Sequence, residues 1–403
     1  MKLTMVIPTY WGREKNIGWQ PGDAVYDHPT PLNKEGTLVR TIESLNILND
    51  KDFELVIIAT ATSQEIEDKV ENKVKGLVKR AKSPVKTYIF SHSDLERVKN
   101  KLPERELSYL LQLRGYSNIR NLCLFLPHLL NSDVALLIDD DEVFEDPFFI
   151  EKAKEFIGKE YEGEKIFAVA GYYLQEDNEY LLSKEFKPYM FYWNKFESMN
   201  EGFRKIIGEE PRLKKTPFVF GGNMVIHREL FMKVPFDPDV TRGEDIDYLM
   251  NAKMFGYEFY LDNKLAIKHL PPPKPHPTWR RVREDILRFV YEREKIRKQK
   301  EIEGMVRIKA ENFDPYPGVF LKEDLEEKVA KASELLALEY LAEEKPEDAK
   351  EALNNIRIIE ESAVPTKDPF DNLLKIQKDW ERLMKIIDDK GVKKSLIEEF
   401  LRE

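Results

Sequence analysis

The sequence predicts an α/β fold with a mostly parallel sheet, followed by an all-helical C-terminal region. Short apolar runs such as 53–60 and 134–138 alternate with amphipathic helical patterns over the first 275 residues. Beyond that point the strand-like runs stop, and helical spacing continues almost to the end of the chain. We therefore predict an α/β domain over residues 1–275 and a helical region over residues 276–403.

The elements expected in the α/β domain follow in chain order. Strands are expected at 2–8, 53–60, 85–90, 134–138 and 167–172, and helices at 36–49, 64–81, 118–130 and 148–158. Ser63 is the expected N-cap of the second helix. The helical region opens with a charged helix at 279–300.

A polar segment from Trp11 to Lys34 separates the first strand from the first helix. It is too long for a simple strand-to-helix turn, and it contains Trp19, Tyr26 and Asp27. A lid over a ligand site and a plain surface excursion both remain open.

Composition limits the function classes. Lys and Arg number 64 against 74 Asp and Glu, a net charge of −10, which argues against a nucleic-acid partner. The 34% of charged residues hints at the ion-pair networks of a thermostable protein. One cysteine, Cys123, lies in an apolar run and excludes a disulfide framework. No apolar run reaches the ~20 residues of a transmembrane segment, so a cytoplasmic protein is expected.

An acidic triplet follows the most hydrophobic predicted strand directly. Asp139, Asp140 and Asp141 come after Val134–Ile138, and ligands of open α/β sheets bind at the carboxyl ends of strands. Clustered carboxylates repel one another unless a cation offsets their charge, and Mg²⁺ or Mn²⁺ accepts such ligands. The alternative is that the three aspartates are only an acidic loop after the strand, without a bound cation.

Three later segments carry further candidate residues. Gly221-Gly222-Asn223 joins two apolar runs. The paired glycines either let the backbone approach a ligand closely or form a hairpin turn. Glu244 and Asp245 follow Gly243 in the first turn of a helix, where acids favour the helix dipole or accept a hydroxyl proton. His269 ends a short strand and is either a structural residue or a metal ligand. As a ligand, its imidazole would favour Mn²⁺ over Mg²⁺.

The order of these motifs resembles the GT-A glycosyltransferases, Rossmann-like nucleotide-sugar-dependent enzymes that include family 2. Val6–Tyr10 is similar to their first strand, and Gly36–Leu45 to their first helix. Gly115 with Arg120-Asn121 is similar to the start of the helix before the metal-binding strand. The triplet matches the DxD element, and Gly221-Gly222 and Glu244-Asp245 match the acceptor-side and ED elements. This resemblance covers residues 2–275. The layout of the whole chain, a GT-A core followed by a helical C-terminal region, is also similar to enzymes of the mannosylglycerate synthase type.

The resemblance implies a hexosyltransferase that uses a nucleotide-diphosphate sugar, a hydroxyl acceptor (a small polar molecule or a glycan), and Mn²⁺ or Mg²⁺. Asp245, with Glu244 beside it, would be the catalytic base, and inversion of configuration is slightly favoured. The implied ligand sets are as follows: metal, Asp139, Asp141 and His269; donor, Pro8, Thr9, Tyr10, Arg120, Asp139 and Asp140; acceptor, Gly221, Gly222 and Asn223.

The chain departs from family 2 after the second strand. That strand ends Ala59-Thr60-Ala61-Thr62-Ser63, without the acidic run that helps to bind base and ribose, so a uridine donor is not assumed. A nucleotidyltransferase stays open as an alternative, although no Gly-rich, Lys- or Arg-bearing phosphate loop follows the first strand. A non-catalytic scaffold that binds a partner or a second copy through residues 276–403 is the other alternative.

The helix expected at 279–300 is locally basic in an acidic protein. It contains nine cations, and an anionic membrane surface is one partner that would suit them. Glu284, Asp285, Glu292 and Glu294 alternate with these cations, which favours a solvated, ion-paired helix.

Overall fold

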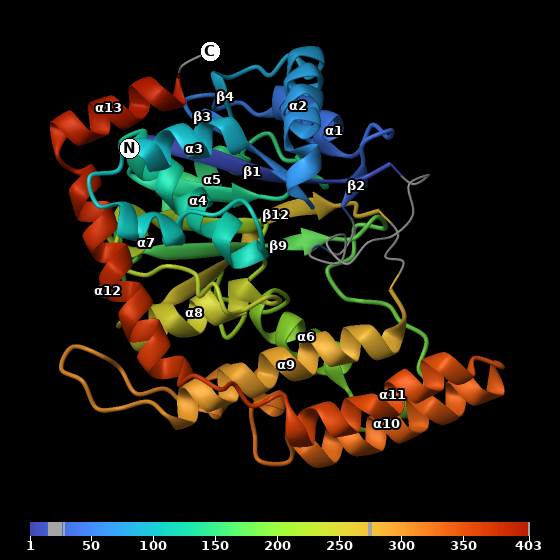
Figure 1. Cartoon of the computed structure of the whole chain (residues 1–403). Helices are drawn as coiled ribbons and strands as arrows, with labels where there is room; N and C mark the ends of the chain where they lie inside the picture. The colour runs from blue at the N-terminus through green and yellow to red at the C-terminus, as the bar shows by residue number, and fades with distance from the viewer. Residues whose placement is uncertain (15–25, 27–28, 273–275, 402–403) are drawn as a thin grey trace.

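A large sheet forms the centre of the computed structural model, which describes residues 1–14, 26, 29–272 and 276–401. The strand order is β10-β12-β9-β11-β5-β1-β3-β4, with β2 beside β1 and β6 beside β12 (Figure 1). The strands are β1 (Leu3–Gly12), β2 (Thr30–Pro31), β3 (Glu54–Ala61), β4 (Thr87–Phe90), β5 (Val134–Ile138), β6 (Glu142–Val143), β9 (Ala168–Leu174), β10 (Leu213–Lys215), β11 (Asn223–His227) and β12 (Phe259–His269). A separate hairpin joins β7 (Glu160–Tyr161) to β8 (Glu164–Lys165).

Most neighbouring strands run in parallel, which confirms the predicted α/β class. β1 pairs in parallel with β3 and β5, β3 with β4, and β9 with β12. β11 is antiparallel to both of its neighbours, β5 and β9. The carboxyl ends of β1 and β5 therefore lie beside the first residue of β11, at one edge of the sheet.

Helices cover both faces of the sheet, and alternate residues of each strand enter two separate cores. In β3, Val56 and Ile58 belong to one core, and Leu55 and Ile57 to the other. This arrangement explains the unbroken apolar runs of the sequence. The helices of the α/β part are α1 (Leu38–Ser44), α2 (Glu67–Ala81), α3 (His92–Lys101), α4 (Tyr116–Leu129), α5 (Phe149–Glu155), α6 (Lys195–Ile206), α7 (Arg228–Phe231) and α8 (Glu244–Met254).

Several local predictions are corrected by the structure. Ser63 begins a short 3₁₀ turn and makes no side-chain cap, and α2 begins only at Glu67. α3 was not expected, although the Ser91 N–H donates to the Asp94 carboxylate at 2.8 Å in a capping box. No strand leads directly into Gly221-Gly222, because residues 218–220 are irregular and β10 ends at Lys215.

The segment 11–34 is described only in part. Trp11 belongs to β1 and is fully buried, so the excursion begins after Gly12. Tyr26 is also buried, whereas Trp19 and Asp27 lie outside the described residues. The lid hypothesis therefore stays a prediction.

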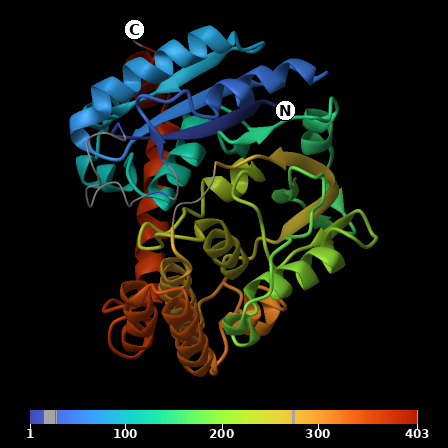
Figure 2. The same ribbon diagram turned by 90° about the vertical axis from the view of Figure 1, so that its right-hand side faces the viewer.

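The helical region is packed against the α/β part. α9 (Thr278–Arg297), α10 (Leu325–Ala342) and α11 (Pro346–Glu361) lie along one side of the molecule (Figures 1 and 2). α12 (Pro369–Ile387) runs back past the sheet to α13 (Lys390–Phe400), where Phe400 packs against Phe90 of β4 with ring centroids 5.6 Å apart. One hydrophobic core contains residues of both regions, so the boundary at residue 275 stays a prediction from sequence character.

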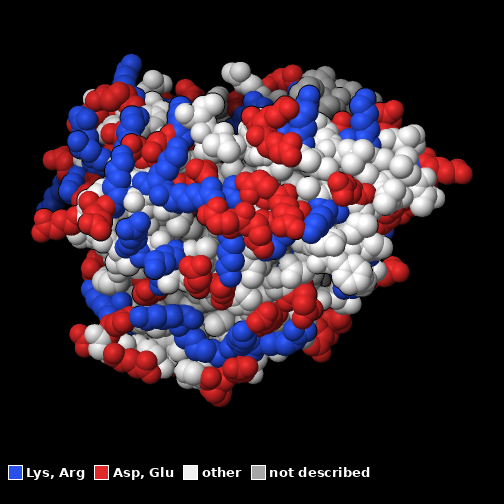
Figure 3. Space-filling view, turned by 90° about the horizontal axis from the view of Figure 1, so that it is seen from below, with Lys and Arg blue, Asp and Glu red and all other residues white. Residues whose placement is uncertain are grey.

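The face formed by the lower helices carries both signs of charge. Figure 3 shows Lys and Arg interleaved with Asp and Glu over this face, in place of a uniformly basic surface. Among the described helices, none combines the length and the hydropathy needed to cross a bilayer.

Candidate active site

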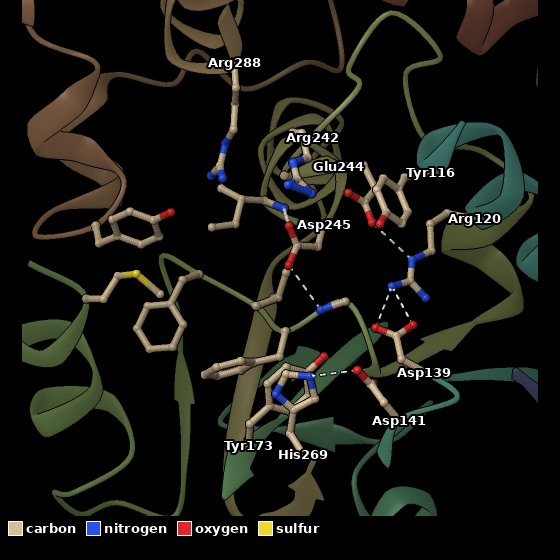
Figure 4. Close-up of a pocket in the computed structure, with 18 of the residues that line it drawn as sticks. Tyr116, Arg120, Asp139, Asp141, Tyr173, Arg242, Glu244, Asp245, His269 and Arg288 are labelled. Carbon is tan, nitrogen blue, oxygen red and sulfur yellow. Dashed lines mark hydrogen bonds and ion pairs between the residues drawn. The ribbon is translucent and has the colours of Figure 1, made fainter. Parts of the chain in front are cut away.

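A pocket of about 300 Å³ opens at the edge of the sheet where β1, β5, β9 and β12 end (Figure 4). Its polar lining comes from segments far apart in the sequence: Tyr10, Tyr116, Arg120, Asp139, Asp140, Asp141, Tyr173, Gly221, Arg242, Gly243, Glu244, Asp245, His269, Arg288 and Tyr316. An apolar wall is formed by Met199, Phe203, Phe218, Val219, Phe220 and Ile246. Of the residues singled out in the sequence, Pro8, Thr9, Gly222 and Asn223 do not line it.

The three aspartates after β5 point in three directions. Asp139 pairs with the buried Arg120, with Nη2 and Oδ1 2.9 Å apart. Asp140 accepts a 2.5 Å hydrogen bond from the Thr9 hydroxyl. Burial, and then the neighbouring carboxylate of Asp141, raise the pKa of Asp140 to about 8. Asp141 faces His269, with Oδ2 and Nε2 3.5 Å apart.

The contact between Asp141 and His269 is made by strand pairing. β6 runs antiparallel to the end of β12 and places Glu142 opposite His269. β12 has 11 residues and is not the short strand expected. Tyr173 of β9 stacks on the imidazole, with centroids 4.5 Å apart and an interplanar angle of 26°.

The predicted metal ligands are only partly assembled. In the part of the chain that the structure describes, no three His, Cys, Asp or Glu side chains converge as a metal centre. Asp141 and His269 are adjacent, whereas Asp139 is directed to Arg120. The carboxylate and imidazole that face each other are a donor set that suits a divalent transition metal.

The two glycines before β11 are required by close packing. Asn223 pairs with Ile138, so Gly222 lies against the start of the acidic triplet. A Cβ on Gly222 would fall 2.0 Å from Oε1 of Glu142, and one on Gly221 would fall 2.8 Å from Nη2 of Arg120. The Asn223 amide is fully buried and donates to the Leu265 carbonyl oxygen at 3.0 Å. Of the predicted acceptor residues, only Gly221 reaches the pocket.

The first turn of α8 directs one carboxylate into the pocket. Gly243 caps the helix with φ +67°, a left-handed conformation that favours glycine. Asp245 accepts hydrogen bonds from the N–H of Gly221 at 3.1 Å and of Ile246 at 2.8 Å, which fixes its orientation. Glu244 instead pairs with Nε of Arg120 at 3.3 Å.

The predicted donor residues of β1 occupy different places. Pro8 and Thr9 are buried within the strand, and Thr9 orients Asp140. Tyr10 lines the pocket and packs against Tyr116 and Tyr26, with centroids 5.3 and 4.5 Å away. An aromatic cluster therefore flanks the acidic side of the pocket, and one member comes from the segment 11–34.

Sequence reasoning missed several lining residues. Tyr173 follows immediately after the strand expected at 167–172, and Arg242 stands one residue before the Gly243-Glu244-Asp245 motif. Arg288 was counted with the cations of a solvated helix. That interpretation is wrong for Arg288, Arg293 and Lys295 of α9, which are ion-paired but buried.

No protein-family model and no curated protein matches this sequence. Among solved structures, the chain is similar to a mannosyltransferase from Pyrobaculum calidifontis in complex with GDP-Man and Mn²⁺, at 13% identity, over 97% of this chain and 87% of that one, with a TM-score of 0.45. It is also similar to glucosyl-3-phosphoglycerate synthase from Mycobacterium tuberculosis in complex with phosphoglyceric acid, at 16% identity, over 68% and 73% of the two chains, with a TM-score of 0.36. The chain thus resembles glycosyltransferases of known structure at low identity, while its own function must follow from its own residues.

Proposed function

We propose that this protein is a divalent-metal-dependent glycosyltransferase that moves a hexose from a nucleotide-diphosphate sugar to a hydroxyl acceptor. The observation that carries the proposal is that the Asp141–His269 pair and the Asp245 carboxylate share one pocket at the carboxyl edge of the sheet. The order of motifs in the sequence independently resembles that of GT-A enzymes.

The charge of the pocket supports a bound cation. Five acidic side chains line it against three arginines, and Asp139, Asp141 and His269 are the residues that would hold the ion. A carboxylate–imidazole set favours Mn²⁺ over Mg²⁺. When bound, the ion would offset the negative charge that develops on the departing diphosphate.

Arg120 is suited to hold a phosphate of the donor. Its side chain is buried against Asp139 and Glu244, and its Nη1 has no hydrogen-bond partner among the described residues. A guanidinium with a donor to spare binds phosphate oxygens well. Tyr10 and Tyr116 offer aromatic faces to the base or the sugar on the same side.

Asp245 is suited to accept the proton of the acceptor hydroxyl. Two backbone N–H groups fix its carboxylate at the N-terminus of α8, and Figure 4 shows it pointing into the pocket. Phe203, Phe218 and Phe220 supply an apolar surface for the less polar face of a sugar. Attack on the side opposite the leaving group would invert the anomeric configuration.

The proposal is tested by hydrolysis of UDP-, GDP- and ADP-hexoses with Mn²⁺ or Mg²⁺. We expect one donor to be hydrolysed, and Asp141→Ala to lose activity on the order of 100-fold. Asp146→Ala is the matched control, because Asp146 bonds Lys152 and does not line the pocket. If no nucleotide sugar binds with any divalent metal, the proposal fails. Turnover of a nucleoside triphosphate with a sugar phosphate would indicate a nucleotidyltransferase.

A further inference from the structure

Arg288 brings the helical region into the pocket. It lies on α9 and passes over the first turn of α8, so that a Cβ on Gly243 would fall 2.3 Å from its Cζ. Gly243 is therefore required for its left-handed backbone and also for the space that this arginine occupies.

The guanidinium of Arg288 is held in place, but one of its hydrogen-bond donors is unused. Nε donates to Oε1 of Glu292 at 2.9 Å, and the group stacks over the ring of Phe289 at 4.9 Å. The side chain is only 7% exposed, and its Nη2 is buried without a hydrogen-bond partner among the described residues. Leaving such a donor unpaired costs about 1–3 kcal/mol, so an incoming acceptor atom would be bound favourably.

The carboxylate that pairs with Arg288 is that of Glu292, and it accepts only from Nε. Asp285 and Asp245 also act on Arg288, but Asp285 is bonded to Lys195 at 2.6 Å, and the two oxygens of Asp245 accept from the backbone N–H groups of Gly221 and Ile246. Arg242, the other arginine of this wall, is bonded to Glu284 at 2.8 Å.

The place of Arg288 identifies which substrate it meets. Figure 4 shows Asp245 between Arg288 on one side and Asp139, Asp141 and His269 on the other. The donor diphosphate would lie with the metal ligands, so Arg288 faces the acceptor.

We propose that Arg288 binds an anionic group, a carboxylate or a phosphate, carried by the acceptor near the hydroxyl that Asp245 deprotonates. The inference rests on the proposed function and makes it more specific. The fork of N–H donors on a guanidinium matches the oxygens of either anion. Neutral alcohols would leave Nη2 unpaired and would be poor acceptors.

The test is calorimetric binding of inorganic phosphate, glycerate and glycerol to the full chain with Mn²⁺ and with the nucleoside diphosphate selected by the donor screen at saturation. We expect at least one anion to bind and glycerol not to bind. Arg288→Gln should weaken anion binding at least tenfold and leave nucleotide affinity unchanged, which also shows that the variant is folded. Arg283→Gln is the matched control, because Arg283 of the same helix bonds Asn355 and Glu351 of α11 away from the pocket.

The outcomes separate this inference from the function on which it rests. Binding of neither anion, equal anion affinity in Arg288→Gln, or competition between anion and nucleotide would overturn the role of Arg288 alone. Failure of the wild type to bind any nucleotide with any metal would overturn the glycosyltransferase proposal, and the role of Arg288 with it. A preference for phosphate or for glycerate tells which anion the acceptor carries.

Discussion

Two buried groups of charges lie along α8, and they are built differently. At its first turn Glu244 and Asp245 line the pocket, whose lining has more acids than arginines. Two residues later, Asp247 faces Lys295 of α9, with Oδ1 and Nζ 2.6 Å apart. Lys295 also contacts Asp237 at 3.1 Å and the side-chain oxygen of Asn251 at 3.1 Å. We call Asp237, Asp247, Asn251, Tyr291 and Lys295 the Lys295 cluster.

The two groups differ in whether the hydrogen-bonding groups of their charged side chains all have partners. In the Lys295 cluster, Tyr291 donates to Asp237 at 2.8 Å and Asn251 donates to Asp247 at 2.7 Å, so both carboxylates are hydrogen-bonded. In the pocket, one nitrogen of Arg120 and one of Arg288 have no hydrogen-bond partner among the described residues. The closed network joins α8 to α9, whereas the open one is the place where we propose that a cation and anionic substrates bind.

The largest expected effect is on stability, from Lys295→Met. The substitution leaves two fully buried carboxylates without their cation, which should lower the free energy of unfolding by about 3–5 kcal/mol. Urea unfolding followed by circular dichroism measures it. Lys300→Met, just beyond the end of the same helix and exposed, should leave the unfolding midpoint unchanged. Equal midpoints for both variants would contradict the structural role of the cluster.

The next effect is on transfer, from a pair of substitutions on one helix. Asp245→Asn should lower the transfer rate by about 10²–10⁴-fold with nucleotide affinity and stability retained, because only the proton acceptor is lost. Asp247→Asn should do the reverse, lowering the urea midpoint while folded enzyme keeps its turnover. Turnover per folded molecule and unfolding midpoints are measured for both. Parallel losses in the two variants would mean that Asp245 is structural.

The smallest effect concerns Glu292, which lies between the two groups and pairs with Arg288. Burial raises its pKa to about 7 against the pull of Arg288, and Asp247 adds to the rise. The folded state therefore keeps a proton that the unfolded state loses above pH 4.5, its ordinary value. This contribution to stability is complete below pH 4.5 and is lost as the pH rises to about 7.

Glu292→Gln removes that dependence on pH. Its free energy of unfolding should rise relative to the wild type by on the order of 1 kcal/mol per pH unit between roughly pH 5 and 7. Urea unfolding across this range measures the difference. Glu294→Gln, which loses only a contact with Arg297 on the same helix, should show no such trend. A constant difference between Glu292→Gln and the wild type would contradict the raised pKa.

Local patterns predicted the parts of the site that depend on near neighbours. The strand at 134–138 agrees with β5 residue for residue, and the acidic triplet stands at its carboxyl end as expected. The acids after Gly243 begin a helix as expected. α3 was missed although its capping box is a local signal, so that omission was avoidable.

The direction in which each side chain points could not be predicted from local sequence patterns. Asp140 lines the pocket and stays a predicted donor ligand, but its carboxylate is held by the hydroxyl of Thr9, 131 positions earlier, a contact that the sequence did not indicate. Arg288 belongs to a helix whose alternating charges predict a solvent-exposed surface, yet only 7% of its side chain is exposed. Burial of a charged helix depends on what packs over it, which a single helix does not encode.

The sequence by itself determined the α/β class and the order of the strands and helices that carry acids and glycines, because hydrophobic period and residue type are local properties. For the same reason it predicted candidate residues for a cation site. Only the tertiary structure decided which distant segments meet at the pocket. β6 pairs with β12 and brings His269 to Asp141, and β11 runs antiparallel beside β5 and brings Gly222 against Glu142. The packing of α9 adds Arg288 to the lining. These contacts depend on strand register and helix packing between distant segments, and those are set by the fit of the whole core.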